Sequence, residues 1–105
     1  MPILDTMKLE ILEKLPGWRG RIVHSPSLTI GHWEFTAGSS IHEHSHLQEE
    51  VWEILAGELE IVIDGTAGRA GPGMVAIIPA HARHAVNALT DGRAIAIDHP
   101  RRPDF

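Results

Sequence analysis

The amino-acid sequence predicts an all-β protein, a single sandwich or barrel built from about eight short strands. Three observations support this fold class. Apolar runs are short, they are separated by Gly, Pro and Asp-Gly turn signals, and helical periodicity is confined to the first fifteen residues. The chain has 105 residues and 43% hydrophobic residues, enough for one domain with a real core.

The first element, residues 6–15, fits two interpretations. Met7, Ile11 and Leu15 recur every four residues, as in a short helix. Leu9 and Ile11 also fit the two-residue alternation of an extra strand. A Pro-Gly pair at 16–17 ends the element in either case.

The remaining elements are all expected to be strands. The two Asp-Gly pairs, at 64–65 and 91–92, are strong turn signals between them. Residues 64–73, DGTAGRAGPG, are expected to form turns throughout. The predicted strands are residues 19–24, 28–37, 41–46, 51–56, 58–63, 74–79, 83–89 and 93–98.

Composition narrows the classes of function. There is no cysteine, which excludes disulfides, thiolate metal sites and thiol nucleophiles. The formal net charge of −5 argues against nucleic acid or an anionic membrane as a partner. No apolar run approaches the roughly 20 residues of a membrane span. The charged N-terminal segment does not resemble a signal peptide, so a cytoplasmic location is expected.

Histidines recur at every second position in the stretch IHEHSH. On a strand, His42, His44 and His46 would share one face, with neighbouring Cα atoms roughly 7 Å apart. Two imidazoles at this spacing can reach one metal ion, provided that other ligands come from elsewhere in the chain. Taken alone, the alternation fits a solvent-exposed strand better than a metal site.

The spacing around these histidines resembles the two signatures of the cupin family. Residues 38–57 read G-x5-H-x-H-x3-E-x6-G, and residues 73–87 read G-x5-P-x-H-x2-H-x2-N. His81 stands where the family usually has glycine, and Asn87 comes one residue early. With both signatures in the expected order, the chain is identified as a member of the small cupins. The resemblance implies one cupin barrel, a double-stranded β-helix or jelly roll, over residues 1–105.

The same resemblance implies the metal ligands His44, His46, Glu50 and His84. Three neutral imidazoles and one carboxylate suit a divalent transition metal, with Mn, Fe, Co, Ni, Cu and Zn all remaining open. Such a set leaves two positions of an octahedral ion free for a substrate or dioxygen.

Four further residues are candidates for the site. His42 and Asp98 are the best guesses for a general base, although Asp98 could also simply cap the last strand. Trp52 would line the pocket if Glu50 points inward, and a plain core position is equally consistent. Trp33 is a second pocket candidate, for which core packing is the simpler interpretation.

Both ends of the chain resemble cupins that act on unsaturated uronates during pectin and alginate breakdown, through LPGWRGRIVH and a PRRPDF tail. In two places the chain departs from that subgroup. Glu50 replaces a frequent glutamine, and Ala96 replaces an acidic residue unless a gap brings in Asp98.

A metal-dependent enzyme acting on a small carbonyl or sugar-acid substrate, of isomerase or ring-opening type, is therefore expected. An Fe(II) dioxygenase and a non-catalytic module that binds a small ligand are the alternatives. A homodimer is also expected, because barrel edge strands need covering and cupins commonly pair.

Overall fold

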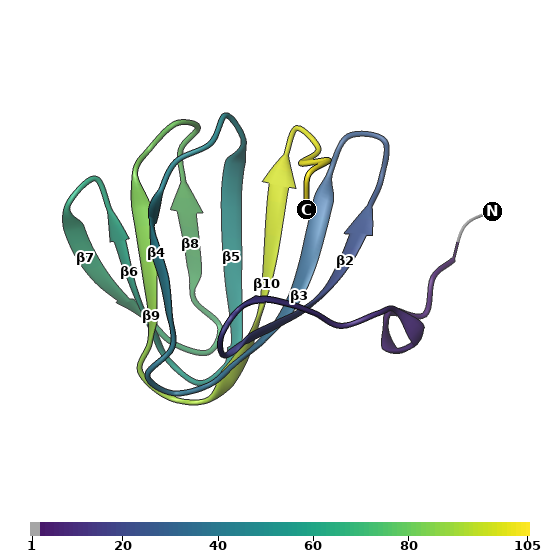
Figure 1. The fold of residues 1–105 in the computed structure, drawn as a ribbon. Coiled ribbons are helices and arrows are strands. Elements are labelled where there is room, and N and C mark those ends of the chain that lie inside the picture. Colours follow the sequence, from purple (N-terminus) through teal and green to yellow (C-terminus); the bar gives the residue numbers. More distant parts are fainter. Residues whose placement is uncertain (1–2) are drawn as a thin grey trace.

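The computed structural model describes residues 3–105, and over this range the all-β prediction is confirmed. Ten strands form two antiparallel sheets that face each other, and the single helical element is one 3-10 turn (Figure 1). The elements are η1 (Thr6–Lys8), β1 (Leu12–Leu15), β2 (Trp18–His24), β3 (Thr29–Phe35), β4 (Ser40–His44), β5 (Glu49–Ala56), β6 (Leu59–Ile63), β7 (Thr66–Ala70), β8 (Val75–Ile78), β9 (His84–Ala88) and β10 (Gly92–His99).

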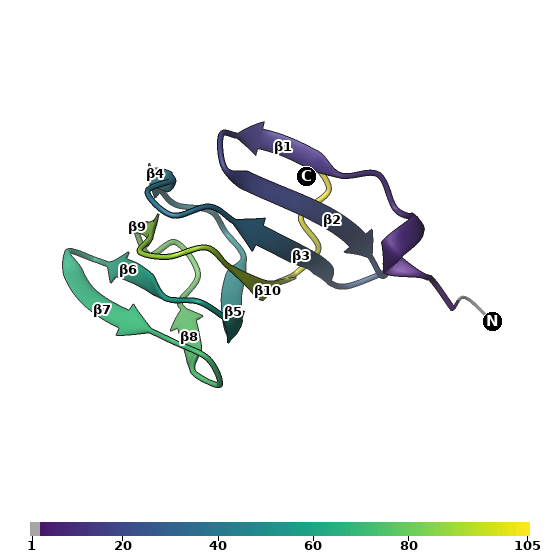
Figure 2. The same ribbon diagram turned by 90° about the horizontal axis from the view of Figure 1, so that it is seen from below.

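The sheets differ in size. The larger has the strand order β1-β2-β3-β10-β5-β8, and the smaller has the order β4-β9-β6-β7. Seen from below, the two sheets enclose the interior of the barrel between them (Figure 2). The last strand, β10, lies between β3 and β5, so residues near the C-terminus reach the middle of the larger sheet.

The structure corrects one part of the predicted strand set. The expectation of turns throughout residues 64–73 is wrong, because β7 (Thr66–Ala70) pairs with β6 in an unbroken antiparallel register. The segment TAGRA has little intrinsic preference for strand. The tight turn at 64–65 places it beside β6, and the neighbouring strand supplies the pairing that its own side chains do not indicate.

The ambiguous segment 6–15 contains both predicted kinds of structure. A 3-10 turn covers Thr6–Lys8, and strand β1 follows at Leu12–Leu15 and pairs with β2. The four-residue recurrence of Met7, Ile11 and Leu15 therefore does not correspond to an α-helix. The residues that suggested a strand, Leu9 and Ile11, lie before β1, and within β1 the two end residues are less exposed than the two between them.

An aromatic cluster fills the centre of the barrel. The Trp18 ring lies 5.4 Å from Phe35 and 6.0 Å from Trp52, measured between centroids. All three side chains are buried, and Leu59 and Val86 of the smaller sheet complete the same core. Trp18 and Trp52 also line a cavity inside the barrel.

Candidate metal centre

Three imidazoles from two adjacent strands meet inside the barrel. His44 ends β4, His84 begins β9, and the two residues are direct cross-strand partners. His46 lies just beyond β4, so the predicted strand over 41–46 is too long and simple alternation does not place this residue. The ligand nitrogens of His44, His46 and His84 nevertheless lie within 4.8 Å of one another.

Backbone carbonyls fix the orientation of all three rings. A carbonyl oxygen only accepts hydrogen bonds, so each Nδ1 must carry the proton and each Nε2 of a neutral ring keeps its lone pair. The Nε2 atoms of His46 and His84 are buried and have no hydrogen-bond partner. The Nδ1 contacts are 2.8 Å from His44 to His42 O, 3.1 Å from His46 to Gln48 O, and 2.9 Å from His84 to Ala82 O.

Glu50 supplies a carboxylate to the same cluster. Its side chain projects inward from β5, and its Oε1 atom lies 3.3 Å from His84 Nε2 and 3.9 Å from His46 Nε2. A six-coordinate ion with bonds of about 2.1 Å separates its ligand atoms by about 3.0 Å when adjacent and about 4.2 Å when opposite. The observed separations therefore fit a transition-metal ion, and the two buried Nε2 atoms without partners are lone pairs that such an ion would use.

A second carboxyl group lies beside Glu50. Asp98 of β10 is its direct cross-strand partner, and the Asp98 side chain is only 3% exposed. Arg102 Nη1 approaches both groups, at 3.7 Å from Asp98 Oδ2 and 3.9 Å from Glu50 Oε2. Asp98 therefore faces the cavity instead of only capping the last strand.

The two carboxyl groups titrate in opposite directions. Burial disfavours the charged form of Glu50, but polar contacts with His84 and Asp98 outweigh it and lower the pKa of Glu50 to about 2. Burial and the neighbouring Glu50 charge raise the pKa of Asp98 to about 8. At neutral pH the pair of carboxyl groups therefore holds one proton.

The histidines are mostly in the form that binds metals. Burial lowers the pKa of both His44 and His46, which favours their neutral rings at neutral pH. Burial acts in the same direction on His84, but the Glu50 carboxylate, 3.3 Å from His84 Nε2, outweighs it and raises the pKa of His84.

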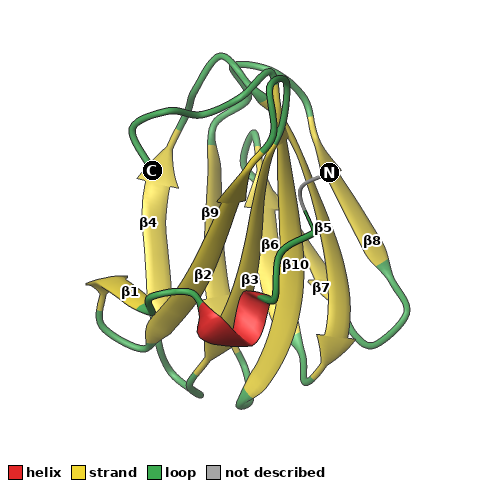
Figure 3. Cartoon of the chain, turned by 90° about the vertical axis from the view of Figure 1, so that its right-hand side faces the viewer, coloured by secondary structure: helices red, strands yellow, loops and turns green. Residues whose placement is uncertain are grey.

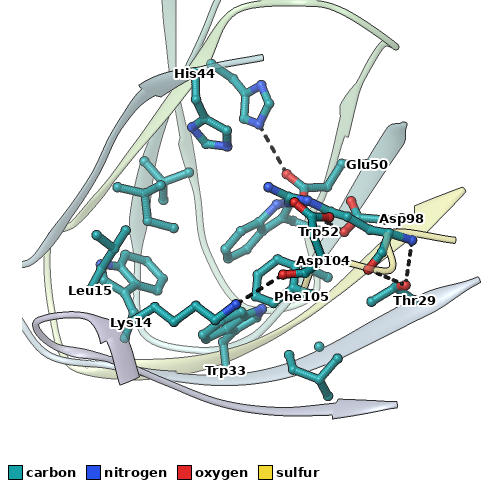
Figure 4. A pocket seen from close by; sticks show the side chains of 18 of the residues that line it. Lys14, Leu15, Thr29, Trp33, His44, Glu50, Trp52, Asp98, Asp104 and Phe105 are labelled. Atoms are coloured by element: carbon teal, nitrogen blue, oxygen red, sulfur yellow. Dashed lines mark hydrogen bonds and ion pairs between the residues drawn. The ribbon is translucent and has the colours of Figure 1, made fainter. Parts of the chain in front are cut away.

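The cluster opens into a cavity of about 360 Å³. Figure 4 shows His44 and Glu50 towards one end and Trp33 and Phe105 towards the other. Trp52 lines the cavity and also packs in the core against Trp18, so both interpretations of this residue apply.

Trp33 is half-buried and lines the cavity, where its ring lies 5.6 Å from that of Phe105. Gly20 and Gly31 make room for it, since a Cβ atom at either position would lie 2.5 Å from the indole. His42 lies on the cavity rim and is exposed.

Sequence reasoning missed the contribution of the C-terminal tail. Arg102 and Phe105 line the cavity, and the Arg102 backbone N–H donates to Thr29 Oγ1 at 2.8 Å. Lys14 from β1 lies over the Phe105 ring at 5.2 Å. The PRRPDF sequence indicated a resemblance, but nothing local in it showed that the tail folds back over the barrel mouth.

Two facing antiparallel sheets with a histidine cluster between them define a jelly-roll barrel with a candidate metal site. The cupin domain model matches residues 31–100, more than half of the chain. The chain therefore belongs to the cupin family. No curated protein sequence matches it significantly.

Solved structures agree on the fold. An RmlC-like cupin from Shewanella frigidimarina has a TM-score of 0.92 at 23% identity, covering 100% of this chain and 96% of the other. KdgF from a Halomonas species has a TM-score of 0.91 at 25% identity, covering 99% and 97%. Oxalate decarboxylase from Bacillus subtilis, a protein with Mn(II) centres, has a TM-score of 0.82 at 19% identity, covering 92% of this chain and 29% of that one.

Within residues 3–105, no helix has the length and apolar character needed to cross a membrane.

Proposed function

We propose that this cupin binds one divalent transition-metal ion through His44, His46, His84 and Glu50 and acts on a small sugar-acid or carbonyl substrate. The reaction class that fits best is isomerisation or ring opening. One observation carries the proposal: three imidazoles, each held by a backbone carbonyl at Nδ1, direct Nε2 towards a shared point beside a buried carboxylate.

The charge balance of the site favours this ligand set. Glu50 is ionised, His44 and His46 are neutral, and together they offer one negative charge and imidazole lone pairs to a divalent ion. Asp98 also lies within reach of His46 and Glu50. We assign Asp98 to proton transfer instead, because its carboxyl group lines the cavity beside Glu50.

The cavity walls favour a small anionic substrate. A volume of about 360 Å³ is near the lower limit for ligand pockets. The Arg102 guanidinium, 20% exposed at its side chain, offers hydrogen-bond donors in the fork geometry that suits a carboxylate. Trp33 and Trp52 offer flat apolar surfaces for a sugar ring. The resemblance of both chain ends to uronate cupins points to the same substrate class.

Each residue of the site would have a separate role in the proposed reaction. When bound, the ion would polarise a substrate carbonyl or hydroxyl oxygen as a Lewis acid. Arg102 would hold the substrate carboxylate, and the tryptophans would exclude water from the reacting atoms. Asp98, whose carboxyl group lines the cavity, would donate a proton to the substrate and take it back after reaction. His42 on the rim is a second candidate for proton transfer.

Metal content tests the first half of the proposal. Elemental analysis of protein purified without an affinity tag should find about one transition-metal ion per chain. His84→Ala should remove most of it, because one of four ligands is lost. His32→Ala is the matched control, since His32 lies on β3 facing away from the cavity. Equal metal content in the two variants would contradict the ligand assignment.

Turnover tests the second half. The metal-loaded protein would be incubated with an unsaturated uronate and with a panel of sugar acids and diketones, with products followed by NMR. Conversion of a sugar acid without oxygen uptake, reduced in Asp98→Asn and Arg102→Ala, is the expected result. Oxygen consumption would instead indicate a dioxygenase. Tight binding without conversion would indicate a ligand-binding module.

A further inference from the structure

The C-terminal tail places an aromatic ring inside the cavity. After β10 the chain turns back across the mouth of the barrel, towards the side where β1 lies (Figures 2 and 3). On one side of the tail, the Arg102 backbone N–H donates to the buried Thr29 at 2.8 Å. On the other side, Lys14 Nζ of β1 donates to Asp104 O at 3.3 Å. With the tail held at both points, Phe105 becomes part of the cavity lining.

The ring against which Phe105 packs, Trp33, lies flat on the inner surface of the larger sheet. A Cβ atom at Gly20 would lie 2.5, 2.7 and 2.8 Å from three neighbouring carbons of its six-membered ring, and one at Gly31 would lie 2.5 Å from its Nε1. Three ring atoms at nearly equal distances mean that the glycine lies under the face of the ring, because an approach to the edge would bring only one atom this close. One face of the indole therefore rests on the two glycines, and the other face is turned towards the cavity.

Phe105 packs on this second face of the indole. The two ring centroids are 5.6 Å apart and the ring planes are tilted by 59°, which is a favourable aromatic contact. Figure 4 shows Phe105 between Trp33 and the side of the cavity that holds Glu50. Part of the surface on which a ligand ring could stack is thus occupied by a side chain of the protein itself.

Two cations hold the Phe105 ring in place. The guanidinium carbon of Arg102 lies 4.7 Å from the ring centroid, and Lys14 Nζ lies 5.2 Å from it, both within the range of cation–π contacts. A sugar ring inserted between Arg102 and Phe105 would need a separation of about 7–8 Å, twice the contact distance of about 3.5–4.0 Å. The observed 4.7 Å therefore leaves no room for a ring between these two groups.

We propose that Phe105 is a specificity-determining residue that limits the bound ligand to one sugar ring. The inference rests on the proposed function, in which Arg102 holds the carboxylate of a ring at the metal centre. A ligand that continues from this ring towards Trp33 would meet Phe105. Specificity then comes from a group that excludes the longer ligand, in addition to the contacts that favour the shorter one. A cavity of about 360 Å³, near the lower limit for ligand pockets, is consistent with a single ring.

Behind Phe105 the structure holds the parts of a second subsite. The Lys14 ammonium contacts a backbone carbonyl and an aromatic ring, and neither group carries a net charge. Without the Phe105 ring, the free face of Trp33 and the Lys14 ammonium would border one space, suited to a second sugar ring and its carboxylate. Removal of one side chain should therefore convert a site for a monouronate into one that also accepts a diuronate.

Fluorescence quenching tests where Phe105 lies, without any ligand or metal. Trp18 and Trp52 are 1% and 3% exposed, so acrylamide in solution reaches chiefly the half-buried Trp33. Phe105→Ala should raise the quenching constant roughly twofold, because removal of the ring uncovers the indole face on the cavity side. Phe105→Tyr is the matched control, since it keeps the ring and should be quenched like the wild type. An unchanged quenching constant in Phe105→Ala would overturn the placement of the ring, and the proposal with it.

Titration calorimetry of the metal-loaded protein tests the specificity, with a saturated monouronate and the matching diuronate as probes. The wild type and Phe105→Tyr should bind the monouronate about tenfold more tightly than the diuronate, and Phe105→Ala should remove most of this preference. Adding Lys14→Ala to Phe105→Ala should weaken diuronate binding again, because the second carboxylate then lacks its cation.

The possible failures can be told apart. Equal binding of the two uronates by the wild type, or a preference for the monouronate that Phe105→Ala leaves unchanged, would overturn the role of Phe105 and leave the proposed function standing. Absence of binding of either uronate by the wild type and by Phe105→Ala would overturn the proposed substrate class, and this assignment with it.

Discussion

Asp98→Asn should remove a pH dependence from the stability of the metal-free protein. The pKa of Asp98 is raised from an ordinary 3.8 to about 8 in the folded protein. Between these values the unfolded chain loses its proton while the folded chain keeps it, so stability falls as pH rises. Below about pH 4 both states are protonated, and above about pH 8 both are ionised, so the effect is confined to this window.

The magnitude follows from the shift. Each pH unit in the window costs about 1.4 kcal/mol, so the wild type should lose about 4 kcal/mol between pH 5 and pH 8 relative to Asp98→Asn. This is a large part of the 5–15 kcal/mol that stabilises a typical domain. Groups that do not contact the carboxyl pair are common to both proteins, so their contributions to the pH dependence cancel in the difference.

Urea unfolding in the presence of a chelator, followed by tryptophan fluorescence at pH 5, 6, 7 and 8, measures this difference. Glu10→Gln, an exposed carboxylate, is the control and should run parallel to the wild type. Glu50→Gln should narrow the pH window from its upper end, because the Glu50 charge is one cause of the raised pKa of Asp98. Parallel profiles for the wild type and Asp98→Asn would refute the shared-proton reasoning.

Three further outcomes are expected. Bound metal should be released on acidification below roughly pH 6, because protons compete with the metal for the imidazoles. The lowered pKa values of His44 and His46 extend metal retention to lower pH. Metal content that stays flat down to about pH 4 would exclude histidine ligation. Glu50→Gln should weaken metal binding by roughly 10- to 100-fold in chelator competition, because the only ionised ligand is lost, and unchanged affinity would remove Glu50 from the ligand set. His81→Gly should raise stability by roughly 0.5–1 kcal/mol in urea unfolding, because His81 has a φ of 65°; a lower urea midpoint would show that no strain is stored there.

The strand pattern made most of the fold predictable. Two-residue alternation places Glu50, Trp52 and Ile54 on one face of β5, and all three are buried. Alternation of apolar and polar residues did not predict β7, whose side chains are small. It also gave the wrong end for β4, where a break in the pairing register precedes His44. Pairing with a neighbouring strand decides such segments, and that information lies elsewhere in the chain.

The candidate site was predictable only in part. The spacing of the two signatures indicated that His84 would approach His44 and His46, and the structure brings these rings together. The proximity of Asp98 to Glu50 depends on the register between β5 and β10, which lie far apart in the sequence. Arg102 enters the site because the tail folds back to Thr29, a contact across 73 residues that no local pattern indicates.

The strand register also decides which side chains reach the cavity. On β5, Glu50 and Trp52 face the cavity while Val51 lies on the other face of the sheet, and on β10 Asp98 faces inward beside Ile97. A slip of one residue in either strand would exchange the two sets and bury aliphatic groups where the metal ligands should lie. The same register sets Glu50 opposite Asp98, so a substitution that shifts the pairing of β5 with β10 should separate the carboxyl pair and displace Glu50 from the histidine cluster.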